Sequence, residues 1–270
     1  MASRLLLVLL GVVQGLTEFL PVSSSGHLVI AQHLIPRFSQ PGVLFDVSLH
    51  AGTLAAVLVY FRRDLAAMAG SLTGSADRAA AQMRWVLWML VVGSVPTAII
   101  GLLFRARVEA LFSEPLVAGV MLWVTGAILF GTERLRREGR PLAAMRTADA
   151  VWVGFVQGLA IMPGLSRSGS TIAAGVFVGL EREDALRYSF LLSIPAVAGA
   201  FALEAVVHGG QWRQGVDVPG YIAATAVAFL VGYWSIGVLF RALRSRRLGL
   251  FALYCCVAGT AGLMVDFFSR

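Results

Sequence analysis

The sequence predicts an all-α integral membrane protein with an inverted-topology repeat, in which each half has one re-entrant helix hairpin and three transmembrane helices. Two observations predict this fold. The first is composition, because 58% of the 270 residues are hydrophobic, 14% are charged and the mean hydropathy is +0.79. A soluble domain would carry nearer about a quarter charged residues. The second observation is a polar motif that occurs twice in this apolar chain.

Six apolar segments are long enough to cross the hydrocarbon of a bilayer, which takes about 20 helical residues. They are residues 43–61, 85–104, 115–131, 189–207, 219–240 and 248–268. Four shorter apolar pieces flank the two polar motifs, and they are residues 4–20, 28–36, 151–162 and 172–180. Pieces of this length fit hairpins that enter the membrane, turn and leave by the same side, provided that protein surrounds the irregular tip. Residues 1–140 and 141–270 then form the two halves of a single membrane domain.

The first polar motif occupies Gly11–Ala31. Gln14 and Glu18 lie four residues apart, which places both side chains on one helical face. Pro21 ends the helix, and the segment Ser23–His27 (SSSGH) follows it. Polar and ionisable groups are costly in apolar surroundings, so they indicate a functional site. The alternative is that Gln14 and Glu18 bond only to neighbouring helices.

The same pattern returns 143 residues later at Gly154–Ala174, where nine of twenty-one positions are identical. Chance would give roughly two or three matches at this composition, so the chain contains an internal duplication. The copies differ at three chemically important positions, which pair as Glu18/Ile161, Ser24/Arg167 and His27/Ser170. One copy keeps an acid and a histidine and the other keeps an arginine. The two copies are therefore expected to build one asymmetric site.

The arginines predict the orientation of the chain in the membrane. The sequence has 22 basic residues, all of them arginine, and a net charge of +7. Fifteen arginines fall in the loops that three crossings per half place on one side, which are residues 62–84, 132–150, 181–188 and 241–247. The opposite side, which includes both termini, carries six. The positive-inside rule makes the first side cytoplasmic, and this basic excess indicates loop orientation and anionic headgroups rather than nucleic acid.

Three further histidines, His33, His50 and His208, lie near the ends of apolar segments. We interpret them as structural or interfacial. His50, in the sequence LHAGT just inside a span, fits that interpretation least well.

An apolar helix follows each serine cluster, which places both clusters at helix N-termini. Unpaired backbone N–H groups, hydroxyl caps and the helix dipole favour an anion such as phosphate there. We predict that the tips bind phosphate through Ser23, Ser25, Gly26, Ser166, Ser168, Gly169, Ser170 and Thr171. Arg167 adds a planar fork of donors for phosphate oxygens.

Four residues are the predicted catalytic groups, and they are Glu18, Ser24, His27 and Arg167. Glu18 and the Gln14 carbonyl offer hard oxygen ligands for Mg²⁺ or Ca²⁺. His27 can be a general acid, a general base or a nucleophile, and Ser24 is an alternative nucleophile. This combination predicts phosphoryl chemistry on a lipid phosphate. Transport of an anionic substrate is the alternative, because inverted repeats with broken helices are a transporter architecture.

Three segments resemble the signatures of the bacterial undecaprenyl pyrophosphate phosphatase family, also called the bacitracin-resistance family. They are QGLTEF (Gln14–Phe19), PVSSSGH (Pro21–His27) and PGLSRSGST (Pro163–Thr171). The resemblance spans essentially the whole chain in motif order, spacing and hydropathy. It implies hydrolysis of undecaprenyl diphosphate to the monophosphate for cell-wall lipid recycling, with a divalent metal. It also implies inverted repeats and a site reached from the outer face of the bacterial inner membrane.

By position, the resemblance assigns family motif residues to Gln14 and Glu18, to Ser23, Ser24 and His27, and to Ser166, Arg167, Ser168 and Thr171. Many members have Glu where this chain has Gln14, which leaves the metal with one fewer carboxylate. A second class of lipid phosphatase is excluded because Ala173 stands where its histidine is required.

Serine attack by Ser24 with help from His27 is the preferred hypothesis, and direct attack by His27 or by metal-activated water are the alternatives. The expected partners are a polyprenyl diphosphate lipid and the bilayer. A second copy of the chain is a candidate partner, which would make a homodimer.

Overall fold

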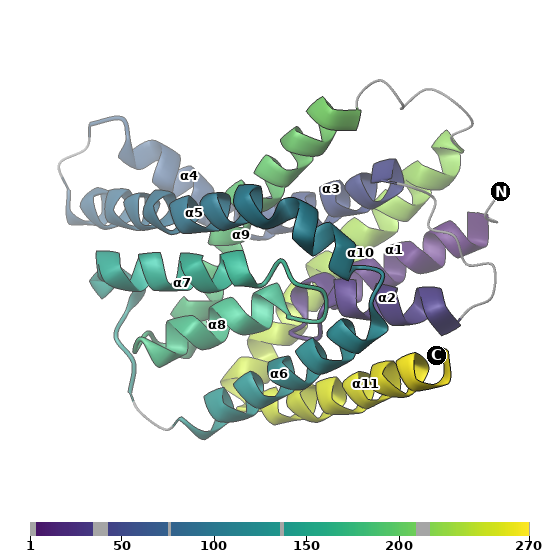
Figure 1. The fold of residues 1–270 in the computed structure, drawn as a ribbon. Coiled ribbons are helices and arrows are strands. Elements are labelled where there is room, and N and C mark those ends of the chain that lie inside the picture. The colour runs from purple at the N-terminus through teal and green to yellow at the C-terminus, as the bar shows by residue number, and fades with distance from the viewer. Residues whose placement is uncertain (1–3, 35–42, 75–76, 136–137, 209–216, 270) are drawn as a thin grey trace.

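The structure is a computed structural model that describes residues 4–34, 43–74, 77–135, 138–208 and 217–269. Helices make up its regular structure throughout these ranges (Figure 1). The first half contains α1 (Arg4–Phe19), α2 (Ser24–Leu34), α3 (Val43–Tyr60), α4 (Arg62–Ser71), α5 (Arg78–Leu111) and α6 (Pro115–Arg134). The second half contains the short 3₁₀ helix η1 (Leu142–Ala144), α7 (Thr147–Leu159), α8 (Arg167–Phe177), α9 (Arg182–His208), α10 (Val218–Arg244) and α11 (Leu248–Ser269).

Each of the six predicted spans falls on a helix. Five of these helices are long and apolar enough to cross a membrane, and they are α5, α6, α9, α10 and α11. The sixth, α3, is apolar but shorter. This confirms the predicted all-α, multi-pass membrane protein. The end of the predicted piece 28–36 and the side chain of His208 lie outside the described residues.

Two helices extend further toward polar sequence than the apolar segments indicate. Helix α5 begins at Arg78 because Asp77 caps it, accepting a hydrogen bond of 2.6 Å from the backbone N–H of Ala80. Helix α9 begins at Arg182, where Glu183 and Asp184 place negative charge in the first turn. Hydropathy marks the part of a helix that meets lipid, and capping residues then set where the helix starts.

Glycines let the hairpin helices approach the long helices closely. A Cβ on Gly15 of α1 would lie 2.8 Å from the Cβ of Val231 in α10, and one on Gly11 would overlap the backbone of Ala224. In the second half, a Cβ on Gly154 of α7 would overlap the backbone of Gly93 in α5. These contacts are close packing between faces of small residues, which is how helices associate in membranes.

The packing of the helices follows the duplication. Helix α1 packs against α10, its counterpart α7 packs against α5, and α6 packs against α11. Figure 1 shows α1 and α7 running toward the middle of the molecule from opposite ends, with α2 and α8 turning back. The first helix of each hairpin therefore packs on a long helix of the other half. The orientation of the two halves relative to a bilayer stays a prediction.

The aromatic core lies directly behind the end of α1. Phe19 is buried and packs edge-on against Phe190 of α9, with ring centroids 5.5 Å apart. Phe190 in turn packs against Phe61, and Phe19 also fills the space above Gly232 of α10. Because Phe19 follows Glu18 in the sequence, this packing fixes the last turn of α1, which carries the carboxylate.

Candidate active site

The tips of the two hairpins are in direct contact. A Cβ on Gly26 would lie 2.8 Å from the Cα of Gly164, and one on Gly169 would lie 3.1 Å from the Cβ of Pro21. The hydroxyl of Ser168 also donates to the backbone carbonyl of Leu20 at 3.4 Å. The two motif copies, which are offset by 143 residues in the sequence, thus meet in one place, as the duplication predicts.

The shared Ser-x-Ser-Gly sequence caps the helix that follows each tip. The hydroxyl of Ser23 accepts from the N–H of Gly26 at 3.3 Å, and that of Ser166 accepts from the N–H of Gly169 at 3.1 Å. Ser23 also adopts a φ of +65°, a left-handed conformation that costs a residue other than glycine about 1 kcal/mol or more. The caps leave earlier backbone N–H groups at the start of α2 and α8 directed out of the helix.

Glu18 is the centre of the site. Its side chain is 7% exposed, and its Oε1 atom pairs with the guanidinium of Arg167 from the other half. Its Oε2 atom accepts hydrogen bonds from the hydroxyl of Ser24 and from the amide nitrogen of Gln14, both at 3.1 Å. A buried carboxylate must be paired to be tolerated, and these donors meet that need. The structure therefore brings together Gln14, Glu18, Ser24 and Arg167, as predicted.

His27 is turned away from this group. Its ring stacks on Tyr254 of α11, with centroids 5.4 Å apart and planes at 9°. Its Nδ1 lies 2.8 Å from the carbonyl of Ser23 and its Nε2 lies 2.8 Å from the Tyr254 hydroxyl. Because both ring nitrogens are occupied, the proton acceptor that Ser24 contacts here is Glu18. A catalytic role for His27 stays a prediction.

The remaining residues of the second tip are buried and hold the tip together. The hydroxyl of Thr171 donates to the carbonyl of Arg167 at 2.8 Å and lies 2.5 Å from the hydroxyl of Ser189. Ser25 contacts Ser23 in the first tip as Ser168 contacts Ser166 in the second, with Oγ–Oγ distances of 3.2 Å and 3.3 Å. The phosphate-binding roles of these side chains and of Ser170 stay predictions.

His50 lies beside the site, where the sequence interpretation did not place it. It is on α3, and its Nε2 atom is 3.8 Å from Oε2 of Glu18. Asp46 stands one turn earlier on the same helix. A carboxylate and an imidazole at a spacing of four inside an apolar helix are a signal that could have identified this face.

Comparison with known proteins identifies the family. The model of the family described as bacitracin resistance protein BacA matches residues 7–261. The chain belongs to this family. It is 50% identical over 254 residues to an undecaprenyl-diphosphatase of Syntrophotalea carbinolica, covering 93% of this chain and 95% of that one. It is 47% identical over 270 residues to an undecaprenyl-diphosphatase of Desulfosudis oleivorans, covering 96% and 97%. The resemblance seen in the motifs is thereby confirmed.

Beside the site of this BacA-family chain lies a small cavity of about 30 Å³. Its polar wall is formed by Gln14, Thr17, Ser24 and Asp46. Its apolar wall is formed by Leu10, Val13, Leu28, Phe45 and Leu49. The cavity therefore joins the motif residues to an apolar surface between α1, α2 and α3.

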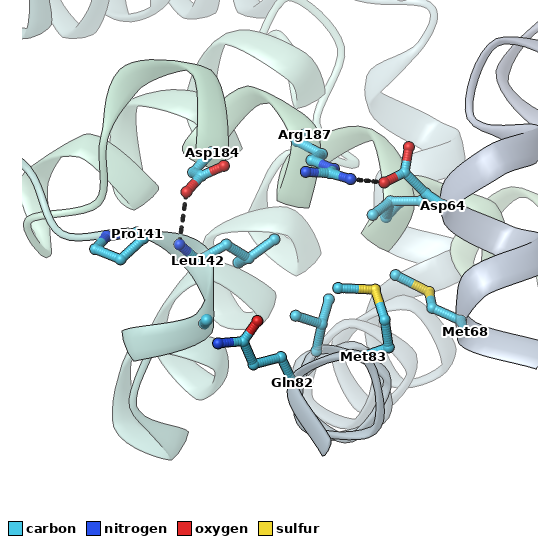
Figure 2. A pocket seen from close by; sticks show the side chains of 11 residues that line it. Asp64, Met68, Gln82, Met83, Pro141, Leu142, Asp184 and Arg187 are labelled. Atoms are coloured by element: carbon cyan, nitrogen blue, oxygen red, sulfur yellow. Dashed lines mark hydrogen bonds and ion pairs between the residues drawn. The ribbon is translucent and has the colours of Figure 1, made fainter. Parts of the chain in front are cut away.

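A larger cavity of about 170 Å³ lies among α4, α5, η1 and α9 (Figure 2). Figure 2 shows Arg187 pointing to Asp64, and Asp184 accepting a hydrogen bond of 2.6 Å from the backbone N–H of Leu142. None of the motif residues lines it. This cavity is larger than the one beside Glu18, but the motif side chains converge at Glu18, which makes Glu18 the centre of the candidate site in this BacA-family chain.

Proposed function

We propose that this chain is an undecaprenyl-diphosphatase, which hydrolyses undecaprenyl diphosphate to undecaprenyl phosphate and phosphate. This reaction would recycle the lipid carrier of cell-wall synthesis. The observation that carries the proposal is the meeting of Glu18 and Ser24 from one half with Arg167 from the other, at two adjoining helix N-termini. The relatives named undecaprenyl-diphosphatase support it over nearly their whole length.

Substrate binding would change the partner of Arg167. Its guanidinium now neutralises Glu18, and phosphate oxygens match the same fork of donors. The N-terminal N–H groups of α2 and α8 add partial positive charge on the same side. A diphosphate at the tips would therefore take Arg167 and free Oε1 of Glu18, so that one oxygen of the carboxylate could accept a proton while the other held a cation.

Ser24 is the nucleophile that the contacts favour. Its hydroxyl already donates to Oε2 of Glu18 at 3.1 Å, so Glu18 can take the proton as Ser24 Oγ attacks the terminal phosphorus. A bond from Ser24 Oγ to phosphorus forms, and the bond from phosphorus to the bridging oxygen breaks, so undecaprenyl phosphate leaves. Water then attacks the phosphoserine and releases phosphate. The sequence predicts that His27 assists Ser24, whereas in this proposal Glu18 is the base.

Trapping and mapping a phosphoenzyme tests this step. Phosphoserine at Ser24 is the expected result. Phosphohistidine at His27 would show the direct histidine route, and a reaction without an intermediate and with inversion at phosphorus would show attack by water.

The donor set around Glu18 fits a divalent cation such as Mg²⁺ or Ca²⁺. The described residues hold no cluster of three His, Cys, Asp or Glu side chains, so the ligands would be mixed, with Glu18 as the anionic one. The amide of Gln14, which now presents nitrogen to Glu18, would present its carbonyl after a half-turn. A cation bound there would supply positive charge to the oxygens of the diphosphate.

We place the protein in the bacterial inner membrane, with its site open to the periplasmic face. The small cavity lies along α1 from Leu10 to Thr17, and the arginine distribution predicts that α1 enters the membrane from the outside. The cavity is too small to hold a prenyl chain, so its apolar wall would only face the start of the chain, and the bilayer would receive the chain itself.

The deciding experiment measures phosphate release by the purified protein in detergent. Undecaprenyl diphosphate is supplied with Mg²⁺ or Ca²⁺, with EDTA, and with each metal restored after EDTA. Metal-dependent release that is lost in Glu18→Gln is the expected result. A transporter or flippase would release no phosphate from the solubilised lipid under any of these conditions.

A further inference from the structure

His50 reaches the site from a helix that belongs to neither hairpin. Helix α3 carries it beside α1, with Nε2 of His50 3.8 Å from Oε2 of Glu18. The other ring nitrogen, Nδ1, lies 2.8 Å from the backbone carbonyl of Asp46. The catalytic steps proposed above make no use of this histidine.

The backbone contact determines how the ring is presented. A carbonyl oxygen can only accept a hydrogen bond, so Nδ1 carries the hydrogen. In a ring with hydrogen on Nδ1 alone, the lone pair of Nε2 faces the carboxylate of Glu18. Two acceptors facing each other are favourable when a cation lies between them. A hydrogen bond from one ring nitrogen to a backbone carbonyl is also the arrangement that orients metal-binding histidines.

The separation of the two atoms suits a shared ion. Nitrogen and oxygen ligands each about 2.1 Å from one metal lie roughly 3.0–3.5 Å apart at ordinary coordination angles. The observed 3.8 Å exceeds that range by a few tenths of an ångström, which small side-chain rotations can close. Gln14 and Ser24 contact the same oxygen of Glu18, so further oxygen ligands are within reach.

The second half of the chain has lost this pair. The offset of 143 residues that relates the two motifs also carries Asp46 to Ser189 and His50 to Ser193. Ser193 donates to the carbonyl of Phe190 at 2.7 Å and is buried. The histidine therefore occurs in the half that also keeps Glu18, whose counterpart is Ile161. Glu18 and His50 therefore both come from the first half, and Arg167 comes from the second half.

We propose that His50 is a nitrogen ligand of the divalent cation held by Glu18. This inference rests on the proposed function for the presence of that cation. The imidazole of His50 supplies the strong metal ligand that the neutral amide of Gln14 does not. An imidazole ligand shifts the preference of a site from Ca²⁺ toward Mn²⁺ and related transition metals. The site would thus prefer Mn²⁺ to Ca²⁺.

The test uses Mn²⁺ alone as a probe of the purified full chain in detergent. Titration calorimetry gives the dissociation constants for Mn²⁺ and Ca²⁺, and pulsed electron paramagnetic resonance detects nitrogen bound to Mn²⁺. We expect one histidine nitrogen coupling in the wild type, which changes on ¹⁵N-histidine labelling. His50→Gln should abolish the nitrogen coupling and weaken the binding of Mn²⁺ more than the binding of Ca²⁺. His50→Leu should raise the dissociation constant for Mn²⁺ by on the order of tenfold or more.

His33→Gln is the matched control. Its Nδ1 makes the same bond to the carbonyl four residues earlier, at 2.9 Å from Val29, but its side chain is exposed on α2. It should leave both the coupling and the dissociation constants unchanged. Elution profile and thermal stability in detergent confirm that each variant is folded, and the labelled wild type tests the ligand without any substitution.

Two results would overturn the inference. The first is Mn²⁺ binding that needs Glu18 but shows no nitrogen coupling and is unchanged in His50→Gln. The second is the absence of any Mn²⁺ binding to the wild type at millimolar metal. Neither result bears on phosphate release, which is measured separately. If the wild type released no phosphate with any divalent metal, the proposed function would fail while the ligand assignment could stand.

Discussion

Glu18 is the residue through which the two halves act on one site. Its carboxylate is almost fully buried and takes donors from Gln14 and Ser24 of its own half and from Arg167 of the other. A buried carboxylate without a cation costs several kcal/mol, about 3–5 when one partner of a buried pair is removed. Substitutions at this pair should therefore affect stability as well as catalysis, and the two effects must be separated.

Glu18→Gln and Arg167→Ala should each lower the rate of phosphate release by on the order of 10² or more, because each removes a charge from the reacting group. Arg167→Ala should also lower the melting temperature, since it leaves Glu18 unpaired, whereas the double variant with Glu18→Gln should regain stability but not activity. Rates are measured per folded protein. Arg244→Ala, which breaks an exposed pair with Glu183, is the control. Folded single variants with wild-type rates would contradict the site assignment.

Gln14 allows a second prediction. Gln14→Glu is nearly isosteric, adds a carboxylate beside Glu18 and restores the residue that many members of the family have. We expect an active enzyme that needs less Mg²⁺ or Ca²⁺ for its half-maximal rate, because a charged ligand binds a hard cation better than an amide. Without metal, repulsion between the two carboxylates should lower its melting temperature, so added metal should stabilise it more than the wild type.

Gln14→Leu supplies the opposite case. It removes the ligand oxygen and should raise the metal requirement sharply. Metal titrations of the rate, together with melting curves with and without metal, compare the two variants. If both showed the wild-type metal dependence, position 14 would serve packing and would not bind the cation.

At the residue scale, the sequence predicted those site contacts that lie within the motifs. Local rules predict that Gln14 and Glu18 share a helical face and that serines cap the helices. The duplication predicts that Ser24 and Arg167, which occupy matching positions in the two copies, lie close together. His50 and Tyr254 come from α3 and α11, outside the motifs, and of these two only His50 has a local signal, which is its spacing of four from Asp46. Those helices are apolar on most faces, so periodicity does not show which face turns toward the site.

At the scale of elements, the apolar segments gave the helices, and their polar extensions were missed. Helix α4 lies within the predicted loop 62–84 because its sequence, RRDLAAMAGS, has no long apolar run. It is joined to α9 through the ion pair of Asp64 with Arg187 (Figure 2). Such surface helices are stabilised by tertiary pairing and helix propensity, which hydropathy does not register.

Gly154 tests the packing between elements. Gly154→Ala places a methyl group against the backbone of Gly93, so α5 and α7 must separate. Overpacking of this kind costs typically about 1–3 kcal/mol, and it should lower the melting temperature and the activity together, because α7 positions the tip that carries Arg167. Gly101→Ala in α5 is the control, since its Cβ would meet no atom within 4 Å, and it should be neutral or slightly stabilising. Equal melting temperatures for both variants would contradict the close contact.

At the scale of the whole molecule, the exposed apolar side chains mark where lipid would lie. Leu102 and Leu103 of α5, Trp234 of α10 and Leu253 of α11 are each more than half exposed. Exposed apolar surface of this extent is unfavourable in water and is accounted for by a bilayer. The duplicated packing of α1 on α10 and α7 on α5 lies inside this shell. The sequence predicted this organisation because duplication and hydropathy are global properties, whereas individual contacts are not.

The orientation of the molecule gives the last prediction. Fifteen arginines fall in the loops of one predicted side and six in those of the other, and three crossings per half should place the second half upside down. Reporters in the loops 62–84 and 132–150 should therefore report cytoplasm, and reporters at both termini should report the outside. Two reporter proteins, each fused in turn at every one of these positions, give the side of the membrane. One reporter is fluorescent only inside the cell, and the other is enzymatically active only outside it.

The loop 132–150 and the C-terminus are the decisive positions. They are separated by α7 and α8, which the predicted topology returns to the side they entered from, and by α9, α10 and α11, which it predicts to cross. Three crossings, an odd number, place these two positions on opposite sides of the membrane. If α7 and α8 each spanned the membrane, they would add two crossings, so the total would stay odd, but the tips would no longer lie at mid-depth. Parity alone therefore tests α9–α11, and a cysteine at the tip of each hairpin, probed with membrane-impermeant reagents, tests the hairpins. The same side for loop 132–150 and the C-terminus would show that the inverted repeat is wrong.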